Sequence, residues 1–371
     1  MCKRDLTRKG ASKMSERKDP GRRKWTGVEY LGIFLVLSSL ASLLFWPHAL
    51  AGLFDAIIKK VFPIVVDIFL TGEVGIAVIV SVIVGRMLER LGFTDALFRV
   101  FAPVMKWLSI NPAVIIPSVY NILGDINAAG RIAGPILMRA KATKAEQKIA
   151  VATMIQSQQS FATFMIGLIA LAATGAAVFP VVLLSIFVPL ILVPWLLSKT
   201  IYRDTRTVEL EELPRFTPGT AYLKTVFDSA KEGTELLLLV IIPAVAVVFG
   251  VIGLLEYIGV WQPIENAFTL LLSALSIEPA TGMLSLLASP TLAMAELQKI
   301  AASIDPRLAV GSFVLASSGL PLSVIFGQVP ATWAAHSDLT EREAMAAAVI
   351  GMLMRLVTAF VIGYFVTPWV V

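Results

Sequence analysis

The sequence predicts an all-α integral membrane protein, an inverted repeat of two halves with about seven full crossings and two re-entrant helical hairpins. Three observations lead to this fold class. Of the 371 residues, 57% are hydrophobic and 15% are charged, whereas soluble domains are about half apolar and about a quarter charged. Long apolar stretches alternate with short basic segments, as expected for a chain that crosses a bilayer repeatedly. The second part of the chain also repeats motifs of the first.

The net charge of +5 comes from the N-terminus. Residues 1–24 hold ten lysines and arginines against three acidic residues, so the rest of the chain is slightly acidic. We expect this tail to be disordered and cytoplasmic, and we expect no nucleic-acid partner. Cys2 is the only cysteine, and the sequence carries no metal-binding, nucleotide-hydrolase or serine-hydrolase motif. The sequence therefore predicts neither an enzyme nor a protein with a metal or a cofactor.

The first predicted transmembrane helix lies in residues 25–48, where the apolar stretch runs from Val28 to Trp46. The same region has the layout of a secretory signal peptide, with a basic start, an apolar run and Ala49-Leu50-Ala51 as a small-residue cleavage site. Both interpretations stay open from the sequence alone.

The predicted first half spans residues 50–197. An amphipathic segment at 50–62 leads to a crossing from Ile64 to Leu88, which is interrupted near Glu73. Residues 108–138 are too long for a simple loop and too rich in proline and glycine for one helix, so they predict a re-entrant hairpin with a polar tip at membrane depth. Two further crossings complete this half, at Ile149–Ala173 and Val178–Leu197.

A charged linker at residues 198–224 follows, and its basic residues predict a cytoplasmic location. The predicted second half spans residues 225–371 and repeats the order of an amphipathic segment, a crossing, a broken stretch and two crossings. These elements are a crossing at Glu235–Leu255, the broken stretch at 266–300, and crossings at 308–329 and 345–370. Because the second half starts after an odd number of crossings, it is predicted to be inverted and to end outside.

The internal repeat is visible in the residues. Leu108-Ser-Ile-Asn-Pro-Ala113 matches Leu275-Ser-Ile-Glu-Pro-Ala280. Farther along, Gln156–Ser160 lies opposite Leu315–Gly319. Chance similarity between apolar helices is the alternative explanation, because shared composition inflates such matches. The order of the motifs and their nearly constant offset favour a duplication.

The stretch from Gly124-Asp-Ile-Asn-Ala-Ala-Gly130 through Gln156-Ser-Gln-Gln-Ser160 resembles the Gate, or nucleoside recognition, domain. Concentrative nucleoside transporters, the membrane part of the ferrous iron transporter B, and spore maturation proteins A and B share this domain. The resemblance covers residues 60–200 and, more weakly, 225–370. It implies re-entrant hairpins and a solute site at the membrane midplane. The chain lacks a GTPase domain and the paired cysteine gate of the iron transporter, which argues against iron transport.

Polar residues at membrane depth are the candidate solute-binding residues, because such groups are costly there unless they are paired or hydrated. Three groups stand out: at the first hairpin tip, on the next crossing, and at the matching places in the second half. They are Asn121, Asp125 and Asn127; Gln156, Gln159 and Ser160; and Thr291, Ser317 and Ser318. In a continuous helix the second group would put two amides and a hydroxyl on one face, which suits a polar ligand. Hydrogen bonding between helices is the structural alternative.

Asp125, Glu73 and Glu296 are the candidate ion-coupling residues, with Na+ or H+ as the ion. Asp is also a preferred residue at the start of a helix, so Asp125 could cap the second arm of the hairpin as well. Arg355 lies in the middle of the last crossing, and we expect it to pair with an acidic side chain in the protein interior.

These features favour a secondary transporter for a small polar solute, with a nucleoside-like molecule as the first candidate. The expected location is a bacterial-type inner membrane, where the lipid bilayer is the main partner and the N-terminus is cytoplasmic. The alternative is a membrane scaffold or signalling component that does not transport, similar to the spore maturation proteins. A homo-oligomer is compatible with either function.

Overall fold

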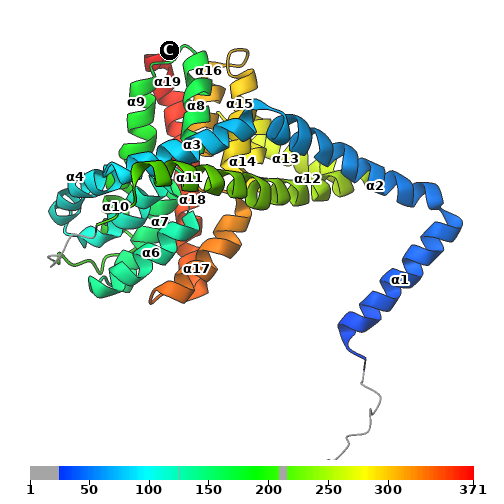
Figure 1. The fold of residues 1–371 in the computed structure, drawn as a ribbon, viewed down its shortest axis with the longest axis horizontal. Coiled ribbons are helices and arrows are strands. Elements are labelled where there is room, and N and C mark those ends of the chain that lie inside the picture. The colour runs from blue at the N-terminus through cyan, green and yellow to red at the C-terminus, as the bar shows by residue number, and fades with distance from the viewer. Residues whose placement is uncertain (1–24, 125, 209–214) are drawn as a thin grey trace, which may run out of the picture. The chain divides into compact units, whose positions relative to one another are not determined.

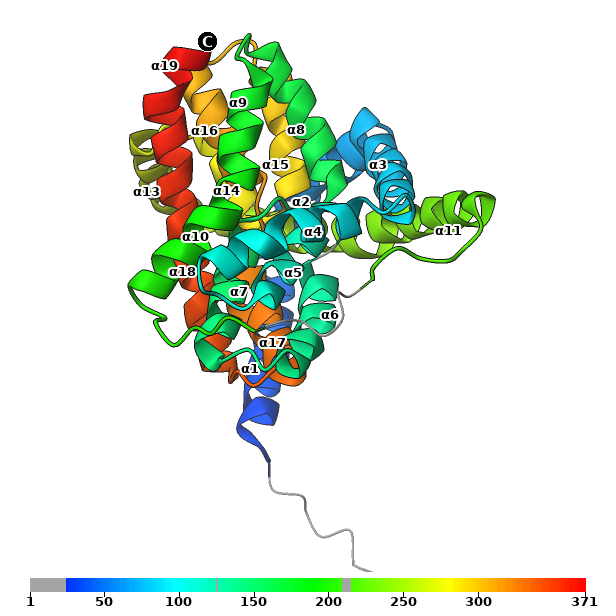
Figure 2. The same cartoon turned by 90° about the vertical axis from the view of Figure 1, so that its left-hand side faces the viewer.

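The computed structural model describes residues 25–124, 126–208 and 215–371, with the exception of the side chain of Asn127. Asp125 lies outside the described residues. Within them, all regular elements are helices, which confirms the predicted all-α fold (Figures 1 and 2). The chain divides into two compact units, Met1–Asp55 and Ala56–Val371.

The first unit contains α1 (Gly27–Phe45), where none of the residues is buried. Thr26 starts this helix with a capping box, because its hydroxyl accepts from the Glu29 backbone N–H while the Glu29 carboxylate accepts from the Thr26 backbone N–H. α1 is apolar on all sides and is long enough to cross a membrane. It coincides with the predicted first transmembrane segment.

The remaining helices belong to the second unit, except that α2 starts in the first unit, because the boundary between the units follows Asp55. From residue 47 to residue 199 they are α2 (Pro47–Phe62), α3 (Glu73–Arg90), α4 (Phe93–Trp107), α5 (Ile116–Leu123), α6 (Ile126–Arg139), α7 (Lys144–Gln156), α8 (Phe161–Ala173), α9 (Val178–Val182) and α10 (Pro189–Lys199). From residue 222 to residue 370 they are α11 (Tyr222–Glu235), α12 (Ile242–Tyr257), α13 (Trp261–Ala274), α14 (Pro279–Leu287), α15 (Pro290–Ile300), α16 (Pro306–Ala316), α17 (Val329–His336), α18 (Glu341–Val361) and α19 (Thr367–Val370). A short 3-10 turn (Pro112–Ile115) precedes α5. π-helical segments extend several helices, at Pro63–Leu70, Leu183–Phe187, Leu236–Ile241, Val324–Gln328 and Ile362–Val366.

Four helical runs in the described residues are long and apolar enough to cross a membrane, and the number rises to six if each of two bent pairs counts as one span. The four runs are Gly27–Phe45, Val178–Lys199, Tyr222–Tyr257 and Glu341–Val370. The bent pairs are Pro47–Leu70 with Glu73–Arg90, at 50°, and Trp261–Ala274 with Pro279–Leu287, at 110°. The first of these bends lies at the interruption near Glu73 that the sequence predicted.

Two crossings that the sequence predicted as continuous helices are broken in the structure. Within the predicted crossing Ile149–Ala173, α7 ends at Gln156 and α8 begins only at Phe161. The predicted crossing 308–329 is likewise interrupted after α16 ends at Ala316. Ser160 has a φ of 58°, a left-handed conformation that a helix cannot contain. The expectation that Gln156, Gln159 and Ser160 share one helical face is therefore wrong.

The repeated Leu-Ser-Ile-Asn/Glu-Pro-Ala motif takes the same local structure in both places. Its serines, Ser109 and Ser276, both have a positive φ, of 61° and 57°. Asn111 and Glu278 each cap the following helix by accepting a backbone N–H, and the next proline occupies the first helical position, where it costs no hydrogen bond. This local match agrees with a duplication, whereas the inverted orientation of the halves stays a prediction.

The core of the second unit is built on α7, α16 and α18. α7 is buried from Ile149 to Gln156 and α16 from Ala309 to Ala316, as expected for helices that are apolar on all sides. α18 packs against both, and both views show it beside α7 (Figures 1 and 2). A side chain at Gly351 would bring its Cβ within 2.6 Å of the Ala152 carbonyl oxygen, so glycine permits this close approach. The breaks at the ends of α7 and α16 are thereby held deep inside the unit.

Candidate functional site

The two breaks pair with each other through their backbones. Gln158 and Ser318 form an isolated antiparallel bridge, and the Gln159 backbone N–H donates to the Ser317 carbonyl at 2.9 Å. Backbone groups released from a helix need new partners when no water is present. Here each break supplies partners for the other, so the segments that the sequence comparison had aligned lie face to face.

Asn121, in α5 of the predicted first hairpin, joins this centre. The Asn121 carbonyl accepts from the Ser160 backbone N–H at 3.2 Å, and its amide nitrogen donates to the Ser157 hydroxyl at 3.1 Å. The start of α6 also lies against the second break, because a Cβ on Gly319 would stand 2.5 Å from the Ile126 Cδ1 atom and 3.3 Å from the Gln159 Oε1 atom. Any larger residue in place of Gly319 would displace these neighbours.

The second broken stretch contributes Thr291, in the first turn of α15. Its hydroxyl lies 3.1 Å from the Thr163 hydroxyl, which in turn lies 3.0 Å from the Ser160 hydroxyl. Ser289 caps α15 by accepting the Leu292 backbone N–H at 3.2 Å, which sets where this helix begins. A chain of three hydroxyls therefore links the first break to α15.

Four buried side-chain oxygens at this centre have no hydrogen-bond donor among the described residues. They are Asn121 Oδ1, Gln156 Oε1, Gln158 Oε1 and Gln159 Oε1. The orientation of three of these amides follows from their nitrogens, which donate to backbone carbonyls of Met154, Gly351 and Gln159. The reverse orientation would put two oxygens against each other. Buried polar atoms are normally paired, so these acceptors suit a cation or a ligand with N–H or O–H groups.

The structure brings most of the predicted site residues together and leaves others apart. Asn121, Gln156, Gln159, Ser160, Ser317 and Ser318 meet at the two breaks, and Thr291 joins them through Thr163. Glu73 is exposed in the first turn of α3, and Glu296 forms an ion pair with Lys299 at 3.2 Å. In the described part of the chain, no hydrogen bond or ion pair joins either carboxylate to the breaks. Asp125 and the Asn127 side chain lie outside the description, so their roles stay predictions.

Two residues at this centre were missed or misjudged from the sequence. The sequence does not predict Gln158 as a site residue, because in a continuous helix it would point away from Gln156 and Gln159. Arg355 was expected to pair with an acidic side chain, and this expectation is wrong. Its guanidinium donates to carbonyl oxygens and to one hydroxyl, and the described residues include no carboxylate within ion-pair distance of it.

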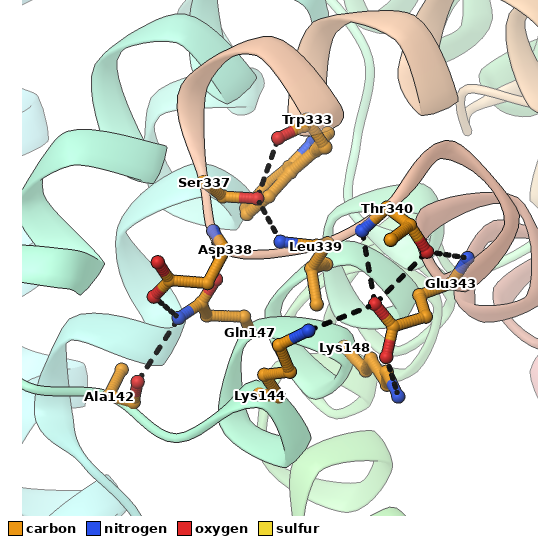
Figure 3. A network of polar contacts seen from close by, with 10 residues as sticks. All are labelled: Ala142, Lys144, Gln147, Lys148, Trp333, Ser337, Asp338, Leu339, Thr340 and Glu343. Atoms are coloured by element: carbon orange, nitrogen blue, oxygen red, sulfur yellow. Dashed lines mark hydrogen bonds and ion pairs between the residues drawn. The ribbon is translucent and has the colours of Figure 1, made fainter.

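At the opposite end of α7, a second polar cluster joins Gln147, Asp338 and Glu343 to their neighbours through hydrogen bonds and ion pairs, as Figure 3 shows. The Gln147 amide nitrogen donates to the Ala142 carbonyl at 3.1 Å and to the Asp338 carboxylate at 2.9 Å, while its oxygen accepts the Asp338 backbone N–H at 3.0 Å. Glu343 pairs with Lys148 at 2.9 Å and caps α18. This network fastens α7 to the turn between α17 and α18, which is a structural role. It contrasts with the amide oxygens at the other end of the helix, which have no donor among the described residues.

No protein-family model and no curated protein matches the chain. Solved structures of the concentrative nucleoside transporter CNTnw do match its fold. The inward-facing, substrate-bound structure is 14% identical, with a TM-score of 0.59, and the match covers 92% of this chain and 87% of that chain. A single-substitution variant in an intermediate state is 13% identical, with a TM-score of 0.59 and coverage of 92% and 88%.

A double-substitution variant of CNTnw in an outward-facing state is also 13% identical, with a TM-score of 0.57 and coverage of 92% and 86%. At these identities the likeness shows the fold alone. It agrees with the nucleoside-transporter part of the sequence resemblance, while the Gate domain itself is matched by no family model. The chain is thus an all-helical, multi-pass membrane protein with the fold seen in these transporter structures.

Proposed function

We propose that this protein is a secondary transporter that binds a small polar solute where its broken helices meet. One observation carries the proposal: in the described part of the chain, the paired breaks leave four buried amide oxygens without a donor. Paired side chains would be expected if the polar residues served only to hold helices together. The fold supports the same function, because CNTnw adopts it in inward-facing, intermediate and outward-facing states.

The chemistry of the site favours a solute that offers hydrogen-bond donors. The amide nitrogens of Asn121 and Gln158 each donate two hydrogen bonds within the protein, so these side chains have only acceptor oxygens to offer. The Gln156 nitrogen donates one, to the Gly351 carbonyl at 3.4 Å, so Gln156 offers an acceptor oxygen and one remaining N–H. A nucleoside-like molecule remains the first candidate, because its sugar hydroxyls and base N–H groups are donors. The same oxygens also suit a cation such as Na+, since hard cations bind amide and hydroxyl oxygens. Coupling through Asp125 is part of the proposal.

The proposed topology follows from the charge distribution. It has a cytoplasmic N-terminus and a cytoplasmic linker at 198–224 between halves at 50–197 and 225–371, in a bacterial-type inner membrane. Because the halves are proposed to be inverted, the C-terminus is external. Reporter fusions after residue 210 and at the C-terminus should lie on opposite sides, and a shared side would rule out the inverted arrangement.

A non-transporting scaffold is the second candidate function, and one observation favours it. The breaks satisfy each other through the backbone, with Gln159 N–H donating to the Ser317 carbonyl, so the centre is partly filled by the protein itself. A scaffold would need no ligand at this place. The two functions therefore differ in whether a small molecule binds between the breaks.

Two measurements on purified full-length protein test the proposal. A thermal-shift screen against nucleosides, polyols, amino acids, organic anions and alkali-metal ions should identify a class that raises the melting temperature. Uptake of that solute into proteoliposomes, with and without an imposed Na+ or H+ gradient, should then show gradient-dependent accumulation. Binding and uptake should both weaken in Gln159→Leu, whereas Gln262→Leu, on the exposed side of α13, should behave as wild type. No binding and no uptake in any class would favour the scaffold.

A further inference from the structure

The guanidinium of Arg355 joins four segments of the chain. Arg355 lies in α18 and its side chain is 0% exposed. Nε donates to the Val314 carbonyl at 2.8 Å, and Nη1 donates to the carbonyls of Gln156 at 3.1 Å and Ser185 at 2.6 Å. Nη2 donates to the Ser317 hydroxyl at 2.5 Å. Three of these acceptors belong to the two breaks, and the fourth lies in the π-helical segment before α10.

The positions of the acceptors explain how a buried cation is tolerated with no carboxylate beside it among the described residues. Gln156 is the last residue of α7, and Val314 lies in the last turn of α16. Carbonyls in the last turn of a helix lack intrahelical partners, and each helix C-terminus carries a partial charge of about −0.5. Two such ends facing one guanidinium are together equivalent to about one negative charge. Arg355 is therefore compensated by the ends of the two broken helices.

We propose that Arg355 is the resident cation of the solute site, a positioning residue that holds both helix ends in place so that the amides beyond them face the solute. The inference rests on the proposed function. Gln156 connects the two roles directly, since its carbonyl accepts from Arg355 while its side-chain oxygen finds no donor among the residues that the structure describes. Loss of the guanidinium would release the ends of α7 and α16 together. The antiparallel backbone bridge between Gln158 and Ser318 would then no longer be held in place.

The geometry requires arginine rather than any cation. A planar guanidinium presents five N–H donors in a fixed fork, whereas the lysine ammonium is a point charge with three rotatable donors. Lysine at this place would keep the charge, but it could not reach the Val314 carbonyl, the Gln156 carbonyl and the Ser317 hydroxyl with the same directions. The Arg355→Lys variant thus keeps the positive charge but loses the hydrogen-bond geometry that positions the helix ends.

Chemical rescue tests the proposal. Arg355→Ala leaves the acceptors around a cavity shaped for a guanidinium ion, and its melting temperature should fall by about 5 °C or more. Guanidinium chloride at about 10 mM should restore much of that loss by mass action, whereas NaCl at the same concentration should not. Phe313→Ala is the matched control, because Phe313 is also 0% exposed on α16 but leaves an apolar cavity. Absence of rescue in Arg355→Ala, or equal rescue in the control, would overturn the resident-cation role.

Uptake kinetics decide between positioning and stability. Arg355→Lys should fold, melt close to wild type and show an apparent KM for the solute raised about tenfold with little change in maximal rate, which corresponds to about 1.4 kcal/mol. A lower melting temperature with an unchanged KM would show a structural role only and would overturn the positioning role. If Arg355→Ala does not fold, the KM of Arg355→Lys still decides. If the wild-type protein binds and transports no solute, the proposed function fails, and the positioning role fails with it. The melting temperature of Arg355→Ala with and without guanidinium still shows whether a cation is required between the helix ends.

Discussion

Replacing Gln156 by methionine should stabilise the protein and at the same time impair solute uptake. Gln156 is 0% exposed, and its side-chain oxygen has no donor among the described residues. Its amide nitrogen makes one long hydrogen bond, 3.4 Å, to the Gly351 carbonyl. Methionine has a similar length and an adaptable thioether, so it can fill the same space without a polar atom that needs a partner.

The magnitude follows from these contacts. A buried acceptor without a donor costs about 1–3 kcal/mol, and a hydrogen bond between membrane helices contributes about 0.6 kcal/mol on average. The free energy of unfolding should therefore rise by about 1 kcal/mol in Gln156→Met, which corresponds to an increase of about 2 °C in melting temperature. If the oxygen accepts a hydrogen bond from the solute, its loss should raise the apparent KM about tenfold.

Gln147 provides a matched control on the same helix. It is also 0% exposed, but its amide makes three hydrogen bonds, two of them with Asp338 (Figure 3). Gln147→Met should lower the melting temperature by several degrees, because it removes these bonds and leaves a carboxylate without its donor. Its uptake should fall only with the amount of folded protein.

The assay compares melting curves in detergent with uptake into proteoliposomes for the two variants and the wild type. Opposite signs of the stability change, together with a raised KM in Gln156→Met alone, support the reasoning. A Gln156→Met protein that melts below wild type, or one that takes up solute with an unchanged KM, would refute it, because the amide would then be a structural group like Gln147.

Three further predictions concern the surroundings of the site. Gly351→Ala should destabilise the protein by about 1–3 kcal/mol in a thermal melt, because the new Cβ would lie 2.6 Å from the Ala152 carbonyl oxygen and force α7 and α18 apart; a stability equal to wild type would contradict this packing. A double-mutant cycle of Thr163→Val and Thr291→Val should give a coupling energy near 0.6 kcal/mol if the 3.1 Å contact between the two hydroxyls only holds the helices together. A larger loss of uptake in Thr291→Val than in Thr163→Val would indicate that Thr291 contacts the solute. Glu146→Gln should lower the free energy of unfolding by about 2 kcal/mol, because the buried Glu146 carboxylate accepts three backbone N–H groups and an amide offers only one oxygen. An unchanged melting temperature would show that these N–H groups find other partners.

Local and compositional properties of the sequence determined the class of the protein. Apolar stretches of bilayer length, basic segments and few charges specify a helical membrane protein whatever its neighbours are. The interruption of residues 108–138 into separate helices was also predictable, because proline and glycine act on their own backbone, whereas their re-entrant arrangement stays a prediction. The repeated Leu-Ser-Ile-Asn/Glu-Pro-Ala motif carries its helix cap and its first-turn proline with it, so both copies fold alike.

The broken helices and the partners of Arg355 were decided only by the tertiary structure. Gln156–Ser160 contains neither glycine nor proline, so no local signal ends α7 there, whereas Gly319 and Pro321 mark the second break. The first break exists because Ser317 and Asn121, both distant in sequence, accept the backbone N–H groups of Gln159 and Ser160 that the helix gives up. Arg355 binds mostly backbone carbonyls, which every residue possesses. A sequence records side chains, so it points to the polar residues of the site, whereas contacts between backbone groups brought together over long distances leave no pattern in it.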